Sequence, residues 1–139
     1  MTETRVVLVR DETLGEGTDN REVLATTVEV ADSALSQARG LMFRSSIPDD
    51  YALVMEVGGG GLLPFPRGPS RQLVHMLFVR FPIDVIWLAG DEVTGVERMH
   101  PWRSVAMAKA DRILELPAGG AEGVSAGDTV VVEGLADDD

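Results

Sequence analysis

The chain contains no cysteine, a single lysine and few aromatic residues. Without cysteine there is no disulfide, no thiolate metal site and no cysteine nucleophile. No run reaches the roughly 18 consecutive apolar residues of a membrane span. The N-terminus, MTETRVVLVR, lacks the basic and apolar regions of a signal peptide. We therefore expect a cytoplasmic protein that is not inserted in a membrane.

Acidic residues dominate the charge. The sequence has 23 Asp and Glu against 12 Lys and Arg, a formal net charge of −11, and it ends in an acidic tail at 135–139. Such a chain repels the phosphate backbone, so no nucleic acid partner is expected. In concentrated salt, the repulsion between surface carboxylates is screened, and the carboxylates keep the protein hydrated. Adaptation to such conditions would explain both the negative net charge and the shortage of lysine. This favours a protein adapted to a high-salt cytoplasm, and the alternative is an ordinary acidic protein.

The length of 139 residues fits a single domain over 1–139 that can bury a hydrophobic core without disulfides. Apolar and β-branched runs between turn signals predict strands along most of it. An N-terminal strand at 5–10 and a second run at 23–31 predict a hairpin. Further strands are expected at about 51–57, 72–80, 83–89, 92–99, 112–116 and 128–134.

One stretch, ADSALSQARGLMFR, changes to a helical period. Asp32 or Ser33 can cap a helix N-terminus. The apolar residues that then share one face are Leu35, Ala38, Leu41 and Met42. This predicts one short amphipathic helix over about 33–43. The expected fold is mainly β, a β-rich α+β domain in which a small antiparallel sheet curls into a partly closed, barrel-like form.

The segment 71–90, RQLVHMLFVRFPIDVIWLAG, places His75, Arg80 and Asp84 in an otherwise apolar run. Both faces of its first half are apolar apart from His75, which predicts a central strand that is interrupted at Pro82. Asp84 then lies on an apolar face, where an unpaired carboxylate would be costly. Its expected partners are Arg44, Arg80 or backbone N–H groups near Pro82, and a structural role in this turn is favoured.

Two function classes remain open. The favoured one is a non-catalytic binding module for a small anionic ligand or a protein partner. Its candidate ligand-binding residues are Arg44, His75, Arg80, Asp84 and Trp102. The alternative is a small enzyme in which Asp84 or His75 acts as general base and Arg44 stabilises developing charge.

A metal site is the remaining specific hypothesis. His75, His100 and Asp84 would supply two histidines and one carboxylate, a set that suits iron or zinc. However, MHPWR at 99–103 is typical of a turn after a strand, where His100 is simply exposed. We predict no metal site, no cofactor and no catalytic residue.

Three segments, VEVADSALSQARGLMFRSSIPDD, HMLFVRFPIDVIWL and ILELPAG followed by GDTV, occur in an order and spacing that resembles the prokaryotic family known as domain of unknown function 192. The resemblance covers about 23–133 and implies a compact β-rich domain with no established activity. Typical members have an aromatic residue followed by Met-Lys-Asn-Thr where this chain has residues 75–79. Here the Lys-Asn pair has become Leu77 and Phe78, so chemistry that depends on that amine is not expected.

Overall fold

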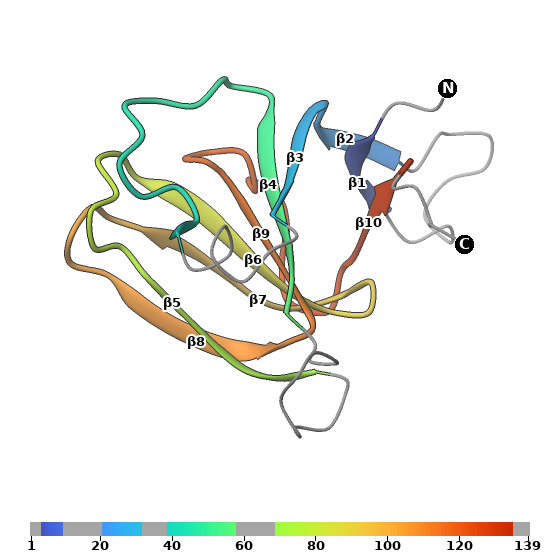
Figure 1. Cartoon of the computed structure of the whole chain (residues 1–139). Coiled ribbons are helices and arrows are strands. Elements are labelled where there is room, and N and C mark those ends of the chain that lie inside the picture. Colours follow the sequence, from blue (N-terminus) through green and yellow to red (C-terminus); the bar gives the residue numbers. More distant parts are fainter. Residues whose placement is uncertain (1–3, 10–20, 32–38, 58–68, 135–139) are drawn as a thin grey trace.

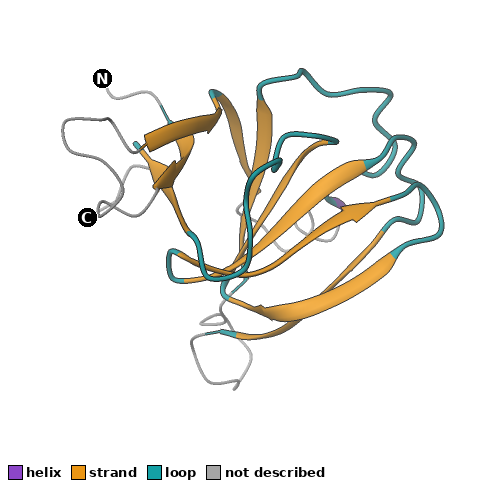
Figure 2. Cartoon of the chain, turned by 180° about the vertical axis from the view of Figure 1, so that it is seen from behind, coloured by secondary structure: helices purple, strands orange, loops and turns teal. Residues whose placement is uncertain are grey.

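The computed structural model describes residues 4–9, 21–31, 39–57 and 69–134. These residues form ten strands, which Figure 2 shows as arrows connected by turns. The strands are β1 (Arg5–Val9), β2 (Arg21–Ala25), β3 (Thr27–Ala31), β4 (Tyr51–Glu56), β5 (Ser70–His75), β6 (Ile83–Ala89), β7 (Glu92–Met99), β8 (Val105–Ala110), β9 (Arg112–Pro117) and β10 (Thr129–Glu133).

Eight strands form one sheet in the order β2-β1-β10-β7-β6-β9-β4-β3, and β5 pairs with β8 in a second sheet (Figure 1). The predicted N-terminal hairpin is present, because β1 pairs antiparallel with β2. The other pairs are also antiparallel except β3 and β4, which run parallel. The large sheet is therefore mixed rather than purely antiparallel.

The two edge strands of the large sheet follow each other in the chain. β2 ends at Ala25 and β3 begins at Thr27, so Thr26 alone crosses from one edge to the other. Asp50 stabilises this corner, the bend at Thr26 between β2 and β3. Its Oδ2 accepts hydrogen bonds from the hydroxyl groups of Thr26 and Thr27, both at 2.6 Å. Among the described strands β2 and β3 do not pair with each other, so the curled sheet does not close into a barrel.

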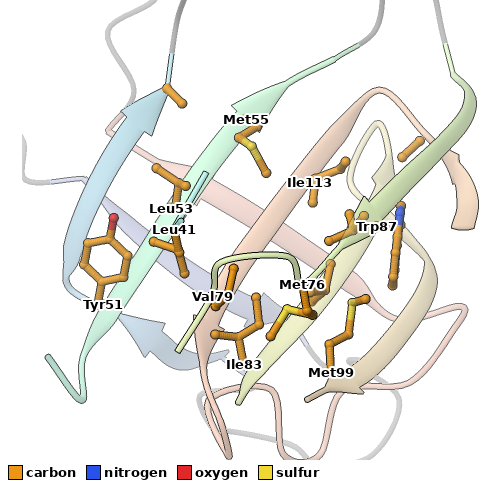
Figure 3. Packing of buried hydrophobic residues seen from close by; sticks show 14 residues of the cluster. Leu41, Tyr51, Leu53, Met55, Met76, Val79, Ile83, Trp87, Met99 and Ile113 are labelled. Atoms are coloured by element: carbon orange, nitrogen blue, oxygen red, sulfur yellow. The ribbon is translucent and has the colours of Figure 1, made fainter. Parts of the chain in front are cut away.

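Both faces of the central strands are buried, and alternate residues enter two hydrophobic clusters. In β4, Tyr51, Leu53 and Met55 belong to the cluster that β5 and β8 cover, shown in Figure 3. Ala52 and Val54 point to the other face, where the curled sheet encloses the second cluster. Burial on both faces explains why β4 and β6 are almost continuously apolar in sequence.

The predicted helix over 33–43 is not among these elements. Most of it, including Leu35 and Ala38, lies outside the described residues, and 41–43 form a turn in which the Met42 N–H bonds to the Arg39 carbonyl at 2.9 Å. Leu41 is nevertheless buried against the cluster under β5 and β8, as predicted for its face. No helix within the described ranges is long and apolar enough to cross a membrane.

β5 is shorter than the predicted strand over 72–80, and it is not central. It ends at His75 and pairs only with β8 among the described strands. Residues 77 and 78, predicted to continue the strand, form a turn. The predicted interruption at Pro82 is confirmed, because β6 begins at the next residue.

Candidate functional site

Asp84 is buried at the start of β6, with 4% of its surface exposed. Its carboxylate accepts hydrogen bonds from the backbone N–H groups of Gly119 at 2.9 Å and Ala121 at 3.0 Å. The Nε of Arg98 donates a third at 2.5 Å. These charge-assisted bonds satisfy the carboxylate and bind β6 to β7 and to the turn that follows β9.

These partners are not the expected ones. The sequence suggested Arg44, Arg80 or the backbone near Pro82, whereas the antiparallel register places Asp84 directly opposite Arg98 on β7. On its other side lies the end of β9, so the turn after that strand supplies the backbone donors. Such pairings join segments far apart in the chain, and the local sequence does not reveal them. The contacts of Asp84 thus join β6 to β7 and to the turn that follows β9.

His75 ends β5 and is half-buried. Its Nδ1 accepts a hydrogen bond from the N–H of Leu77 at 3.1 Å, which supports the turn after the strand. His75 lies on the side of the large sheet that β5 covers, whereas Asp84 alternates with residues of that side and points to the other face. Within the described ranges, no three His, Asp or Glu side chains lie close enough to hold a metal ion.

Arg44 is already engaged by an acidic partner. Its guanidinium is bonded to Oε1 of Glu29 at 2.9 Å and lies 5.6 Å from the centre of the Tyr51 ring. The hydroxyl of Tyr51 donates to the same Glu29 oxygen at 2.6 Å. The hydrogen bond from Tyr51, together with that from Arg44, lowers the pKa of Glu29. Much of the positive charge of Arg44 is therefore neutralised within the protein.

Three aromatic side chains at the tips of three turns form a row that we call the aromatic surface: Phe43, Phe78 and Trp102. Their side chains are exposed, by 53%, 43% and 53% respectively. The ring centroids of Phe43 and Phe78 lie 5.2 Å apart, and those of Phe78 and Trp102 lie 4.9 Å apart in an edge-to-face arrangement. Phe78 is thus the central ring of the row.

All three residues have a left-handed backbone, with φ of 70°, 63° and 69° for Phe43, Phe78 and Trp102. No other non-glycine residue in the described part of the chain has a positive φ. Each such conformation costs about 1 to 3 kcal/mol and persists only where surrounding contacts impose it. Here the N–H of Phe43 bonds to the carbonyl of Phe78, and that of Trp102 to the carbonyl of Met76, both at 2.9 Å. Strain of this kind concentrates at functional sites.

The predicted site residues fall into two groups. Arg44 directly follows Phe43 in the first turn, Arg80 lies two positions after Phe78 in the second, and Trp102 forms the third. His75 ends the strand that leads into the second turn, whereas Asp84 lies apart on the other face of the sheet.

Sequence reasoning missed Phe43 and Phe78. For Phe78, the available signal was the resemblance noted above, which implies a polar Lys-Asn pair where this chain has Leu77 and Phe78, side chains that are 49% and 43% exposed. Asn adopts the left-handed conformation more readily than Phe, so the chain carries the less suitable residue at this turn.

Two crystal structures are similar to this chain over most of its length. One is of a candidate transcription regulator from Sinorhizobium meliloti 1021, with 23% sequence identity and a TM-score of 0.72, covering 96% of each chain. The other is of a protein of unknown function from Novosphingobium aromaticivorans DSM 12444, with 24% identity and a TM-score of 0.69, covering 91% of this chain and 83% of that one. At these identities the likeness shows a shared fold.

No curated protein matches the chain. The model of the family DUF192, described as an uncharacterized ACR, matches residues 16–132. The match includes all of the described strands except β1 and the last residue of β10. The chain therefore belongs to the DUF192 family.

Proposed function

We propose that the protein is a non-catalytic binding module whose aromatic surface docks an acidic segment of a partner protein that carries an apolar anchor. The observation that carries this proposal is the row of three exposed aromatic rings, each on a strained backbone. If the sequence were selected only for stability, these turns would carry residues suited to a left-handed backbone, and aromatic side chains would be buried rather than exposed to water. Exposed aromatic residues are instead the typical energetic centres of protein interfaces.

Further exposed apolar side chains lie on the small sheet next to the aromatic surface. Leu73 on β5 is paired with Met107 on β8, and these side chains are 56% and 51% exposed. Val105, three residues after Trp102, is 63% exposed. Soluble monomers rarely leave a large contiguous apolar area in water, and larger ones mark interaction sites. The small sheet therefore offers additional contact area to a partner that reaches beyond the three rings.

The charge near the rings favours an acidic partner. An arginine follows each aromatic residue within two positions: Arg44, which is paired with Glu29, and then Arg80 and Arg103. The turn segments 40–48 and 76–82 contain no Asp or Glu, and neither does 100–105, although the whole chain has a net charge of −11. Arg80 and Arg103 are exposed and form no ion pair with a described residue. Guanidinium groups beside aromatic rings suit a segment in which carboxylates flank an apolar side chain.

The fluorescence of Trp102 provides a direct test, because the second tryptophan, Trp87, is only 1% exposed. We would titrate the protein with three short peptides of alternating residues, Glu-Leu, Lys-Leu and Glu-Gly, and follow iodide quenching. The Glu-Leu peptide is expected to bind and to protect Trp102. The other two peptides lack either the charge or the anchor and are expected to bind much more weakly.

Two variants and one control sharpen this test. Phe78→Asn removes the central ring while placing a residue suited to the left-handed backbone there, so binding should fall without loss of the fold. Exchange of both Arg80 and Arg103 for Gln should weaken binding of the Glu-Leu peptide, whereas Arg71→Gln, an exposed arginine outside the three turns, should not. Preferred binding of the Lys-Leu peptide, or no binding of any peptide, would refute the proposal. Tighter binding of benzoate than of the Glu-Leu peptide would favour a small anionic ligand instead.

The alternative function, a small enzyme, has less support than the binding module. Three residues donate hydrogen bonds to Asp84, and Arg44 is bonded to Glu29. His75 lies on the side of the large sheet that β5 covers, whereas Asp84 points to the other face, so they do not combine around one substrate. A general base needs to be within hydrogen-bond reach of the proton that it removes.

We also propose that the chain is adapted to a high-salt environment. The support is compositional: a net charge of −11 and a single lysine among 139 residues. Screening by salt reduces the mutual repulsion of surface carboxylates, so such a chain should be more stable in concentrated salt.

A further inference from the structure

A cavity of about 400 Å³ lies between the large sheet and the segments that cover it. Its walls are mainly apolar and include Leu41, Met42, Met55, Val79, Ile83 and Ile113. Its polar lining includes Arg39, Gln72, His75 and Glu115. The volume falls in the range of roughly 300 to 1,000 Å³ that is usual for sites that bind small molecules.

Glu115 is the least expected residue of this lining. It stands in the middle of β9, with 5% of its surface exposed, and the register places Leu53 on one side of it and Val85 on the other. Both neighbours are buried apolar residues. No described residue forms a hydrogen bond or an ion pair with its carboxylate, whose oxygens remain open to the cavity.

The charged groups around the cavity do not neutralise this carboxylate. Arg44 acts on Glu115 only at a distance, because its guanidinium is bonded to Glu29. Tyr51 donates its hydroxyl proton to the same Glu29, and Arg39, at the cavity wall, is largely exposed. Burial raises the pKa of Glu115 to about 7, although the charge of Arg44 opposes this. The chain thus holds a carboxylate where an apolar residue would be more stable, which is a pattern of functional sites.

We propose that this cavity binds a small molecule made of an apolar body and one ammonium group, with the ammonium group bonded to Glu115. The apolar walls would contact the body of the ligand, and the ammonium group would supply both N–H donors and the missing positive charge. The negative charge of the chain also raises the local concentration of cations. A carboxylate ligand would be repelled by Glu115, and an alcohol would supply a donor without a charge.

A metal ion fits the cavity less well than an ammonium group. Oxygen-binding cations take several carboxylate or carbonyl ligands, and among the described residues Glu115 has no acidic or histidine neighbours that complete such a set. A single carboxylate in an apolar cavity instead matches a ligand with one charge.

Three probes of matched shape test the proposal: cyclohexylamine, cyclohexanol and cyclohexanecarboxylate. At pH 8, where Glu115 is mostly ionised, titrations followed by NMR should show binding of the amine about tenfold or more tighter than that of either of the other two. Glu115→Gln should weaken amine binding by a similar factor. Glu97→Gln removes the same charge from an exposed position on β7 and should leave the binding unchanged.

A second measurement keeps the test independent of how well the variant folds. The side-chain carboxyl carbon of Glu115, followed by NMR as pH is varied, should titrate at a lower pH when the amine is present, because the bound ammonium favours the ionised form. The proposal is overturned if the alcohol binds as tightly as the amine, if Glu115→Gln binds the amine normally, if the carboxyl titration does not move, or if no probe binds. Peptide binding at the aromatic surface has a separate readout in Trp102, so either proposal can fail alone.

Discussion

Exchange of Glu115 for Gln should stabilise the protein in a way that depends on pH. The two side chains have nearly the same shape, but only Glu titrates. In the unfolded chain its pKa is near the ordinary value of 4.5, whereas burial raises it to about 7 in the folded protein. The difference in stability between the variant and the original protein therefore reports the ionisation of this one buried group.

The magnitude follows from the difference in proton affinity. Each unit of pKa difference corresponds to about 1.4 kcal/mol, so the shift from 4.5 to about 7 amounts to about 3 kcal/mol. The folded protein holds the proton more tightly, so this contribution is fully present below pH 4.5, declines as the pH rises and is lost above about 7. Relative to the original protein, Glu115→Gln should thus gain about 3 kcal/mol in unfolding free energy between pH 4 and pH 8.

Urea unfolding at a series of pH values measures this gain. Every other titrating group is common to both proteins, so its contribution cancels in the difference. Glu97→Gln, on an exposed part of β7, should show a difference that hardly changes with pH. If the difference in unfolding free energy between Glu115→Gln and the original protein also stays constant with pH, then Glu115 has an ordinary pKa in the folded protein. The reasoning about its burial would then be wrong.

Four further outcomes are expected. Asp84→Asn should lower the unfolding free energy by about 1 to 3 kcal/mol, since it weakens charge-assisted bonds, while peptide binding at the aromatic surface stays intact; normal stability with lost binding would contradict a structural role. Leu41→Ala should lower the unfolding free energy by about 2 to 5 kcal/mol, measured by chemical unfolding, because Leu41 is buried. The control Val30→Ala, at a partly exposed position, should lower it by under about 1 kcal/mol. Equal losses would show that Leu41 is not buried in the core. Phe78→Asn should change stability by less than about 1 kcal/mol, because relief of backbone strain offsets the lost ring contacts; a loss of several kcal/mol would mean that the ring serves the fold. The melting temperature should climb from dilute buffer to molar KCl, and an unchanged or falling value would remove the proposal of a high-salt environment.

The strands were largely predictable because their signals are local. Alternating or continuous apolar runs located seven of the ten strands, and Pro82 marked the start of β6. β8 was missed because its inward residues are all alanines, at 106, 108 and 110, which pack against the core but give a weak strand signal. The run 23–31 gave no sign of the corner at Thr26, since the division between β2 and β3 depends on Asp50, far along the chain.

The candidate sites were less predictable, because exposure and pairing are properties of the folded chain. The apolar residues Leu77 and Phe78 were expected inside a buried strand, whereas they lie in an exposed turn. Buried Asp84 was identified by its apolar face, but its partner Arg98 is set by strand register. Glu115 was visible as a lone acid in RILELP. Only the fold shows that no described residue pairs with it and that it faces a cavity.

The way in which β10 joins the large sheet has a consequence for its motions. β10 pairs with β1 along its whole length but meets β7 at one register pair, Thr129 with Glu92, supported by nearby backbone bonds to Asp91 and Val93. The unit β2-β1-β10 is thus attached to the remaining five strands by this short junction, by the corner at Thr26 and by apolar packing. Local opening of a protein follows such boundaries. Amide hydrogens of this three-stranded unit should therefore exchange with solvent together and sooner than those of β6 and β9, which are paired on both sides at the centre of the sheet.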